Sequence, residues 1–73
     1  MDRAHVETYK GFEIKVYVWR DVGDGEYVGM YEIYPRKSLA QRGIAKGGFV
    51  IAQDAEHAAL AKAKFWIDQQ TNT

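Results

Sequence analysis

The feature that most constrains this 73-residue chain is a long stretch of helix-forming residues near its C-terminus. From Asp54 to about Gln70 there is no Gly or Pro, and Ala, Leu, Lys, Glu and Gln dominate. At 100° per residue one apolar stripe forms, consisting of Ala55, Ala59, Leu60, Ala63, Trp66 and Ile67. We expect Asp54 to cap this helix and its alanines to allow a close approach to a sheet. The opposite side, with His57, Lys64 and Asp68, is expected to face water.

The residues that could form this sheet alternate with a period of two, which is typical of a strand with one buried face. The first strand is predicted from Tyr9 to Trp19, and its even positions are the apolar residues Phe12, Ile14, Val16 and Val18. The even-numbered face is therefore predicted to be buried. A second strand is predicted from about Glu26 to Arg36, with Pro35 ending its pairing.

The Asp24-Gly25 pair predicts a two-residue hairpin turn between these strands, because a type I′ turn needs positive φ at both central residues. Val18 would then lie opposite Tyr31 on the buried face, and Val16 opposite Ile33. The other face would pair Trp19 with Met30, Tyr17 with Glu32, Lys15 with Tyr34 and Glu13 with Arg36. Gly23 also permits a longer loop with a bulge.

The segment from Arg36 to Gly48 is predicted to be a loop. It contains four cations and no acid, namely Arg36, Lys37, Arg42 and Lys46. Two interpretations are open: a site for an anion or an acidic partner, and a solvated, mobile loop. A short third strand is predicted from Phe49 to about Ala52.

The fold class predicted from these elements is α+β, a three-stranded antiparallel β-meander with one C-terminal helix packed on one face. A single domain is expected over residues 9–70, because a chain of this length has no room for a second. Residues 1–8 are assigned to an N-terminal arm, ordered or disordered, and residues 71–73 to a C-terminal tail.

With this β-β-β-α order, the chain resembles a family of small uncharacterised bacterial proteins. The resemblance covers roughly residues 9–70, and the matching features are Tyr9-Lys10-Gly11-Phe12, the Phe49 strand, and the helix with Ala55, Ala59 and Ile67-Asp68. The family is similar to a double-stranded-RNA-binding domain that lacks its first helix, and it brings no established activity. Duplex binding in the standard mode is not expected, because Asp54 and Glu56 would repel phosphate at the start of the helix.

Composition argues against several function classes. Ten Lys plus Arg balance ten Asp plus Glu, which disfavours bulk attraction to nucleic acid or to an anionic membrane. The chain has no Cys, one serine (Ser38) and two separated histidines, His5 and His57. Neither a catalytic triad nor a metal-ligand spacing is present, so no enzyme activity, cofactor or metal is expected. The sequence has no membrane-length apolar run and no secretory start, so a cytoplasmic location is expected.

One helix can cover only one side of the sheet, so the other side is predicted to expose Lys15, Tyr17, Trp19, Met30, Tyr34 and Arg36. Three interpretations are open for this face: a protein interface, including self-association; stacking of single-stranded bases on the rings; and a ladder that only stabilises the sheet. The function predicted is a non-enzymatic interaction module that binds a protein partner or itself. The alternative is weak single-stranded nucleic-acid binding, which would also use the loop cations Lys37, Arg42 and Lys46.

Overall fold

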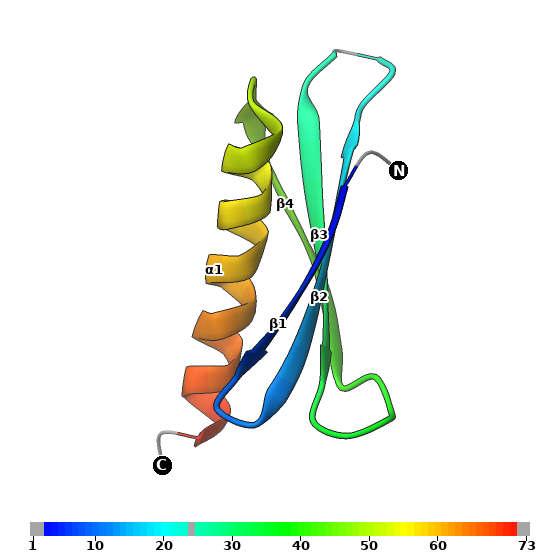
Figure 1. The fold of residues 1–73 in the computed structure, drawn as a ribbon. Helices are drawn as coiled ribbons and strands as arrows, with labels where there is room; N and C mark the ends of the chain where they lie inside the picture. Colours follow the sequence, from blue (N-terminus) through cyan, green and yellow to red (C-terminus); the bar gives the residue numbers. More distant parts are fainter. Residues whose placement is uncertain (1–2, 24, 72–73) are drawn as a thin grey trace.

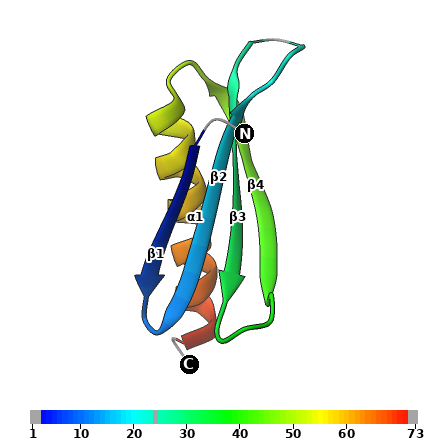
Figure 2. The same cartoon turned by 45° about the vertical axis from the view of Figure 1, so that its right-hand side comes forward.

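The chain forms two layers, a four-stranded antiparallel sheet and one helix that lies across one face of it (Figure 1). The computed structural model describes residues 3–23 and 25–71. The elements are β1 (Arg3–Tyr9), β2 (Phe12–Arg20), β3 (Tyr27–Tyr34), β4 (Gln41–Phe49) and α1 (Ala52–Thr71). Each strand lies beside its neighbour in sequence, in the order β1-β2-β3-β4 (Figure 2). The predicted α+β meander with a C-terminal helix is confirmed, but the sheet has one strand more than predicted.

The additional strand is β1, so the prediction of an N-terminal arm was wrong from residue 3 onward. β1 pairs with β2 along its whole length, ending with Tyr9 opposite Phe12. Lys10 and Gly11 join the two strands, with φ angles of 51° and 82°. Positive φ at both central residues is characteristic of a type I′ turn, whose twist matches that of hairpin strands. The Tyr9-Lys10-Gly11-Phe12 segment is therefore a hairpin turn and not the start of the first strand.

The β2–β3 connection is longer than the predicted two-residue turn. Arg20 and Tyr27 form the last pair of the hairpin. The backbone N–H of Asp21 donates to the Glu26 carbonyl at 2.7 Å and closes the loop. Asp24, half of the predicted turn, lies outside the described residues.

The longer loop shifts the β2–β3 register by two residues from the predicted one. Val16 lies opposite Tyr31 instead of Ile33, and Trp19 lies opposite Val28 instead of Met30. The other observed outer pairs are Tyr17–Met30, Lys15–Glu32 and Glu13–Tyr34. Because side chains alternate with a period of two, a shift of two keeps every side chain on its predicted face.

Most of the segment predicted to be a loop forms β4, which is the largest error of the sequence prediction. β4 pairs with β3 from Gln41 opposite Ile33 to Phe49 opposite Tyr27, with one irregularity near Gly29. Only residues 35–40 remain a connection, and it starts at Pro35, as predicted. Phe49 therefore ends a strand that it was predicted to begin. Three of the nine residues of β4 are glycines, so intrinsic propensity favours a loop, and pairing with β3 overrides it.

The helix α1 begins at Ala52, two residues earlier than predicted. The N–H of Asp54 donates to the Ile51 carbonyl at 3.1 Å, which places Asp54 inside the first turn and not at the cap. The predicted stripe is confirmed: its members Ala55, Ala59, Ala63 and Ile67 are buried, and Leu60 and Trp66 are partly buried. The alanines do allow close approach, because a Cβ added at Gly29 of β3 would lie 2.5 Å from the Ala55 carbonyl oxygen.

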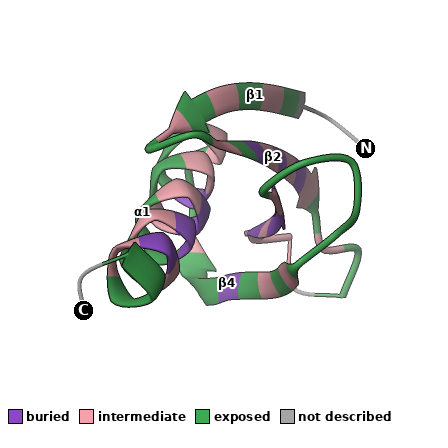
Figure 3. Ribbon diagram, turned by 90° about the horizontal axis from the view of Figure 1, so that it is seen from below, coloured by how far each residue is buried: buried purple, intermediate pink, exposed green. Residues whose placement is uncertain are grey.

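The core lies between α1 and the middle of the sheet (Figure 3). The buried sheet residues are Ile14, Val16 and Val18 on β2, Tyr31 and Ile33 on β3, and Ala45 on β4. Val16 and Val18 are 1% and 0% exposed, which confirms the predicted buried face of the first strand. The helix packs on β2, β3 and β4 and leaves the other face of the sheet to solvent.

Candidate interaction surfaces

The face of the sheet turned away from α1, called here the outer face, carries five of the six side chains predicted for it, all except Arg36. It is made of Lys15, Tyr17, Trp19, Met30, Glu32, Tyr34, Arg42 and Ile44. Tyr17, Trp19 and Met30 are partly exposed, and none of them belongs to the core beneath the helix. The edge strands extend the apolar surface, with Val6 57% and Ile44 48% exposed. Aromatic and apolar side chains from all four strands therefore share a face that no described element covers.

A buried carboxylate lies in the middle of the outer face. Glu32 is 8% exposed, and its Oε2 accepts hydrogen bonds from Arg42 Nε at 3.1 Å and Nη2 at 2.8 Å. The Tyr34 hydroxyl donates to the other oxygen at 3.0 Å. The Arg42 guanidinium, assisted by the Tyr34 hydroxyl, holds the pKa of Glu32 below its ordinary value. Sequence analysis missed this pair because it placed Arg42 in a loop.

The ring contact predicted between Lys15 and Tyr34 is present, although the two residues are not opposite each other. Lys15 Nζ lies 4.9 Å from the centre of the Tyr34 ring and reaches it diagonally across the hairpin. On the same face, burial and then the nearby Glu32 charge raise the pKa of the Tyr17 hydroxyl. The outer face is therefore held by side-chain contacts as well as by backbone pairing.

The four cations predicted to form one basic loop do not lie together. Arg36 and Lys37 are exposed in the 35–40 connection, so Arg36 is not on the sheet opposite Glu13 as predicted. Arg42 lies on β4 and is bound to Glu32. Lys46 lies toward the other end of β4, where it lines a hollow of about 110 Å³ with residues of the β2–β3 connection. The structure therefore divides the predicted anion site between two ends of the sheet.

Polar side chains join β1 to α1 in what we call the polar seam. Lys64 Nζ lies 2.7 Å from a Glu7 oxygen. Asp68 accepts a hydrogen bond from the Tyr9 hydroxyl at 2.9 Å and pairs with Lys10 Nζ at 2.7 Å. Lys64 and Asp68 thus bind β1 and do not simply face water, a correction that follows from the unpredicted strand.

The hydrogen bonds of the polar seam lower the pKa values of its two carboxylates, Glu7 and Asp68. The hydrogen bond from Lys64, followed by that from His5, lowers the pKa of Glu7. The hydrogen bonds from Lys10 and Tyr9 lower the pKa of Asp68. Both carboxylates are therefore held in their charged forms against the cations that tie β1 to the helix.

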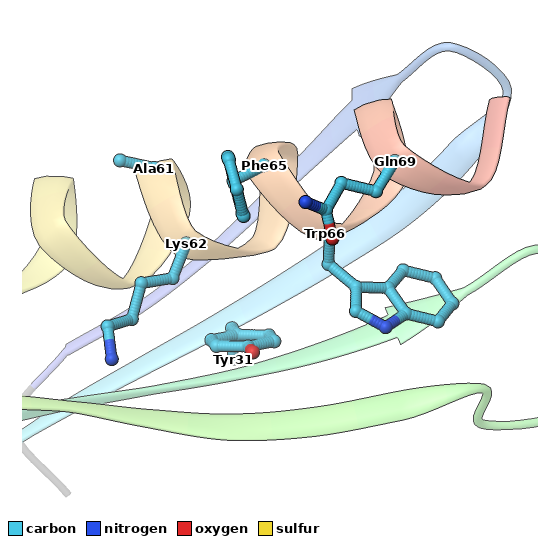
Figure 4. Close-up of a pocket in the computed structure, with 6 residues that line it drawn as sticks. All are labelled: Tyr31, Ala61, Lys62, Phe65, Trp66 and Gln69. Atoms are coloured by element: carbon cyan, nitrogen blue, oxygen red, sulfur yellow. The ribbon is translucent and has the colours of Figure 1, made fainter. Parts of the chain in front are cut away.

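On the opposite side of α1 lies an apolar groove of about 520 Å³, called here the β4 groove (Figure 4). Its lining residues are Tyr31, Ala61, Lys62, Phe65, Trp66 and Gln69. The Tyr31 ring lies against Gly43 of β4, where an added Cβ would be 2.3 Å from the Tyr31 hydroxyl oxygen. Phe65 is 64% exposed beside the groove. Sequence analysis missed this site because it did not place Gly43 on a strand beside Tyr31, where the missing side chain leaves room for the Tyr31 ring.

The residues considered for catalysis or metal binding remain scattered. His5 lies near two acids, with Nε2 3.2 Å from Glu7 and Nδ1 3.8 Å from Glu56. His57 is exposed on α1, and Ser38 is exposed in the connection that follows β3. Among residues 3–23 and 25–71, no three His, Cys, Asp or Glu side chains gather as metal ligands would. In the same part of the chain, no helix is long and apolar enough to span a bilayer.

Comparison with protein-family models, curated proteins and solved structures gave no match. The resemblance to the small bacterial family therefore stays a prediction. The outer face, the polar seam and the β4 groove are therefore the features of the molecule that bear on its function.

Proposed function

We propose that this chain is a small binding module without catalytic chemistry, which docks on a protein surface through its outer face. The observation that carries the proposal is the uncovered layer of Tyr17, Trp19 and Met30 opposite the helix. An antiparallel sheet with one solvated face commonly carries polar side chains there. Here aromatic and sulfur-containing side chains occupy it instead, and these residue types are enriched at protein interfaces.

The backbone that carries these side chains is held in place before binding. Tyr17 and Trp19 lie on β2, and Met30 lies on β3, the two central strands, which are paired on both sides. Their backbone is fixed before a partner arrives, so little conformational entropy is lost on association. A partner therefore meets a preformed surface.

The Glu32–Arg42 pair would give such an interface its orientation. Two Arg42 nitrogens bind Glu32, while the Arg42 side chain remains 57% exposed. The guanidinium has five N–H donors, so donors remain for a carbonyl or carboxylate of the partner. Because Glu32 fixes the guanidinium, these donors point in one direction.

A second copy of the chain is the first partner to test. The outer face carries both signs of charge, Lys15 and Arg42 against Glu13 and Glu32, and the chain has a formal net charge of zero. Two copies would not repel each other strongly. A chain this small also has a thin core, and association is a common source of additional stability.

Single-stranded nucleic-acid binding is the weaker proposal. Of the loop cations predicted for it, Lys37 lies outside the sheet and Arg42 is bound to Glu32. On the face itself, Lys15 lies over the Tyr34 ring. Glu32 adds a carboxylate among the rings that bases would have to approach. The electrostatic attraction on which such binding depends is therefore small.

The test compares the unaltered chain with Trp19→Ser and with the matched control Phe65→Ser, which removes an aromatic ring from the β4 groove. We expect light scattering up to millimolar concentrations to show self-association that Trp19→Ser weakens about tenfold and Phe65→Ser leaves intact. If the chain stays monomeric, competition is measured on partners captured from a lysate. Free unaltered chain and Phe65→Ser should then displace a partner that Trp19→Ser does not.

Two results would contradict the proposal. The first is equal behaviour of Trp19→Ser and the unaltered chain in both assays. The second is a set of outer-face amide shifts on adding oligothymidylate at low salt that disappear at high salt, which would favour nucleic-acid binding instead.

A further inference from the structure

We propose that the β4 groove binds an extended segment of a partner protein, which adds to the sheet as a fifth strand beside β4. The segment supplies apolar side chains to the groove and, on the outer side of the sheet, an acidic side chain opposite Lys46. This site is separate from the outer face and does not rest on the function proposed above.

The first support is the free edge of β4. β4 is hydrogen-bonded to β3 alone among the described elements, so the backbone groups along its other side have no strand partner (Figure 2). The strand is nine residues long, and such an edge is a template for a further strand. One backbone group of this edge is occupied: Lys62 Nζ donates a long hydrogen bond of 3.4 Å to the Ile44 carbonyl. An incoming backbone N–H can replace this weak bond and release the ammonium group.

The second support is the space beside that edge. Because Gly43 has no side chain, the Tyr31 ring lies over it and lines the groove, so a side chain from a strand next to β4 would meet this ring. Phe65 and Trp66 form the wall on the helix side (Figure 4). A volume of about 520 Å³ lies within the range of small-ligand pockets and suits one aromatic or two aliphatic side chains.

Charge identifies the chemistry of the occupant. β4 carries Arg42 and Lys46 and no acid, and Lys62 lies at the groove. Arg42 is already balanced by Glu32. Lys46 shares a hollow with Asp21 and Glu26 but forms no ion pair among the described residues, and its side chain is exposed. A carboxylate on the incoming strand opposite Lys46 would therefore complete a cross-strand pair.

The same charges disfavour a second copy as the occupant. If two β4 strands paired antiparallel around Ile44, Lys46 of each copy would lie opposite Arg42 of the other. Like charges directly opposite each other destabilise a strand pair. This repulsion applies to the register centred on Ile44, and Glu32 reduces the Arg42 part of it. The occupant we infer is therefore a different chain, whose apolar residues lie on the groove side and whose acid lies opposite Lys46 on the outer side.

The alternation of β4 defines a probe. An antiparallel peptide needs an acid opposite Lys46, aliphatic residues opposite Ala45 and Ile44, and an aromatic residue opposite Gly43. The blocked peptide Ser-Glu-Val-Val-Phe-Thr-Ser meets these requirements. Two matched control peptides replace its Glu with Lys and its Phe with Ser.

We expect this peptide to shift the amide signals of Gly43, Ile44 and Lys46 and to change the Trp66 fluorescence. Binding should weaken about tenfold with either control peptide and with Phe65→Ala, because the ring and the carboxylate each make a defined contact. Lys46→Ala should weaken binding of the Glu peptide and leave the Lys peptide unchanged or better. Trp19→Ser, on the outer face, should bind the Glu peptide as the unaltered chain does.

Four results would overturn the inference. One is an absence of β4 amide shifts with the Glu peptide at millimolar concentration. Another is equal binding of the Glu and Lys peptides. The third is a set of β4 shifts that grow with protein concentration alone, which would make a second copy the occupant. Loss of binding in Trp19→Ser would assign the peptide to the outer face and would also contradict the inference.

Discussion

The two long sides of the helix α1 differ in how they meet the sheet. Toward β1, Glu7 forms an ion pair with Lys64 at 2.7 Å. Asp68 accepts a hydrogen bond from the Tyr9 hydroxyl at 2.9 Å and forms a 2.7 Å ion pair with Lys10 of the following turn. Toward β4, the strand offers Gly43, and an apolar groove of about 520 Å³ remains. One helix thus has a side closed by polar contacts and a side left open.

The difference arises from two rows of residues spaced four apart on the same helix. Lys64 and Asp68 form the row that faces β1, and Ala61, Phe65 and Gln69 form the row beside β4. Long charged side chains span the distance to an edge strand, whereas the uncharged side chains of the β4 row do not. Lys62, next to that row, reaches β4 only through a long 3.4 Å contact with the Ile44 carbonyl. The open side is therefore a property of the sequence, and it is the side where a partner can add contacts.

The largest loss of folding stability is expected at Gly29, where the sheet lies closest to the helix. Gly29→Ala places a Cβ 2.5 Å from the Ala55 carbonyl, so it should push α1 from the sheet and destabilise the chain by roughly 2–3 kcal/mol. Thermal and urea unfolding measure this change. Gly23→Ala, in the β2–β3 loop, is the control and should change stability little. Equal stability of the two variants would mean that helix and sheet are further apart than described.

Removing the ionic contact that ties β4 to β3 should have the next largest effect. Glu32→Gln leaves the Arg42 guanidinium with a neutral partner and should cost about 1 kcal/mol at neutral pH. Faster amide hydrogen exchange should be confined to β3 and β4, while β1 stays protected. Faster exchange in β1 instead would show that the two sides of the sheet are coupled.

Low pH should weaken the polar contacts that join β1 to the helix. The pKa values of Glu7 and Asp68 are lowered by their cationic partners, so their contribution to stability is complete above the ordinary carboxyl pKa of about 4. It is lost as the pH falls through the lowered values of the folded state. Amide signals of β1 should therefore change as the pH falls below about 4, before signals of the β4 groove do. Signals of Phe65 and Trp66 that move first would contradict this order.

A single substitution tests the same seam at neutral pH. Asp68→Asn weakens the contacts to Tyr9 and Lys10 and should lower the melting temperature, by less than Glu32→Gln because the carboxylate is half exposed. The matched control is Gln69→Ala on the open side, which should leave the melting temperature unchanged. An equal loss in both variants would remove the distinction between the two sides.

The smallest change in folding stability is expected at the β4 groove. Phe65 is 64% exposed, so Phe65→Ala should change the unfolding free energy by no more than about 0.5 kcal/mol. Denaturant unfolding measures this directly. A loss of several times that amount would mean that Phe65 packs into the fold and is not available to a partner.

The faces of the central elements could be predicted from the sequence because they depend on periodicity alone. The period of two along β2 identified Val16 and Val18 as core, and the helical period identified Ala55 and Ile67. Neither result depends on loop lengths. The face of β3 was predicted from the turn, and it was right because the register error was an even number of residues.

The edge strands could not be predicted in the same way. The helix-facing side of β1 carries polar residues that bind α1, such as Glu7, so it lacks an apolar period. Only the Lys10-Gly11 turn signals that hairpin. In β4, Gly43, Gly47 and Gly48 suppress strand propensity, and the strand exists because β3 offers an unpaired edge. Both interaction surfaces depend on β4, which is why sequence analysis described one in part and missed the other.

The outer face exists as a binding surface only if the helix shields one face of the sheet and leaves the other exposed. Paramagnetic broadening of methyl signals by a soluble gadolinium chelate tests this claim directly. We expect strong broadening of Val6 and Ile44, which are 57% and 48% exposed, and protection of Val16 and Val18. Protected Val6 and Ile44 methyls in the monomer, together with broadened Val16 and Val18 methyls, would contradict the account.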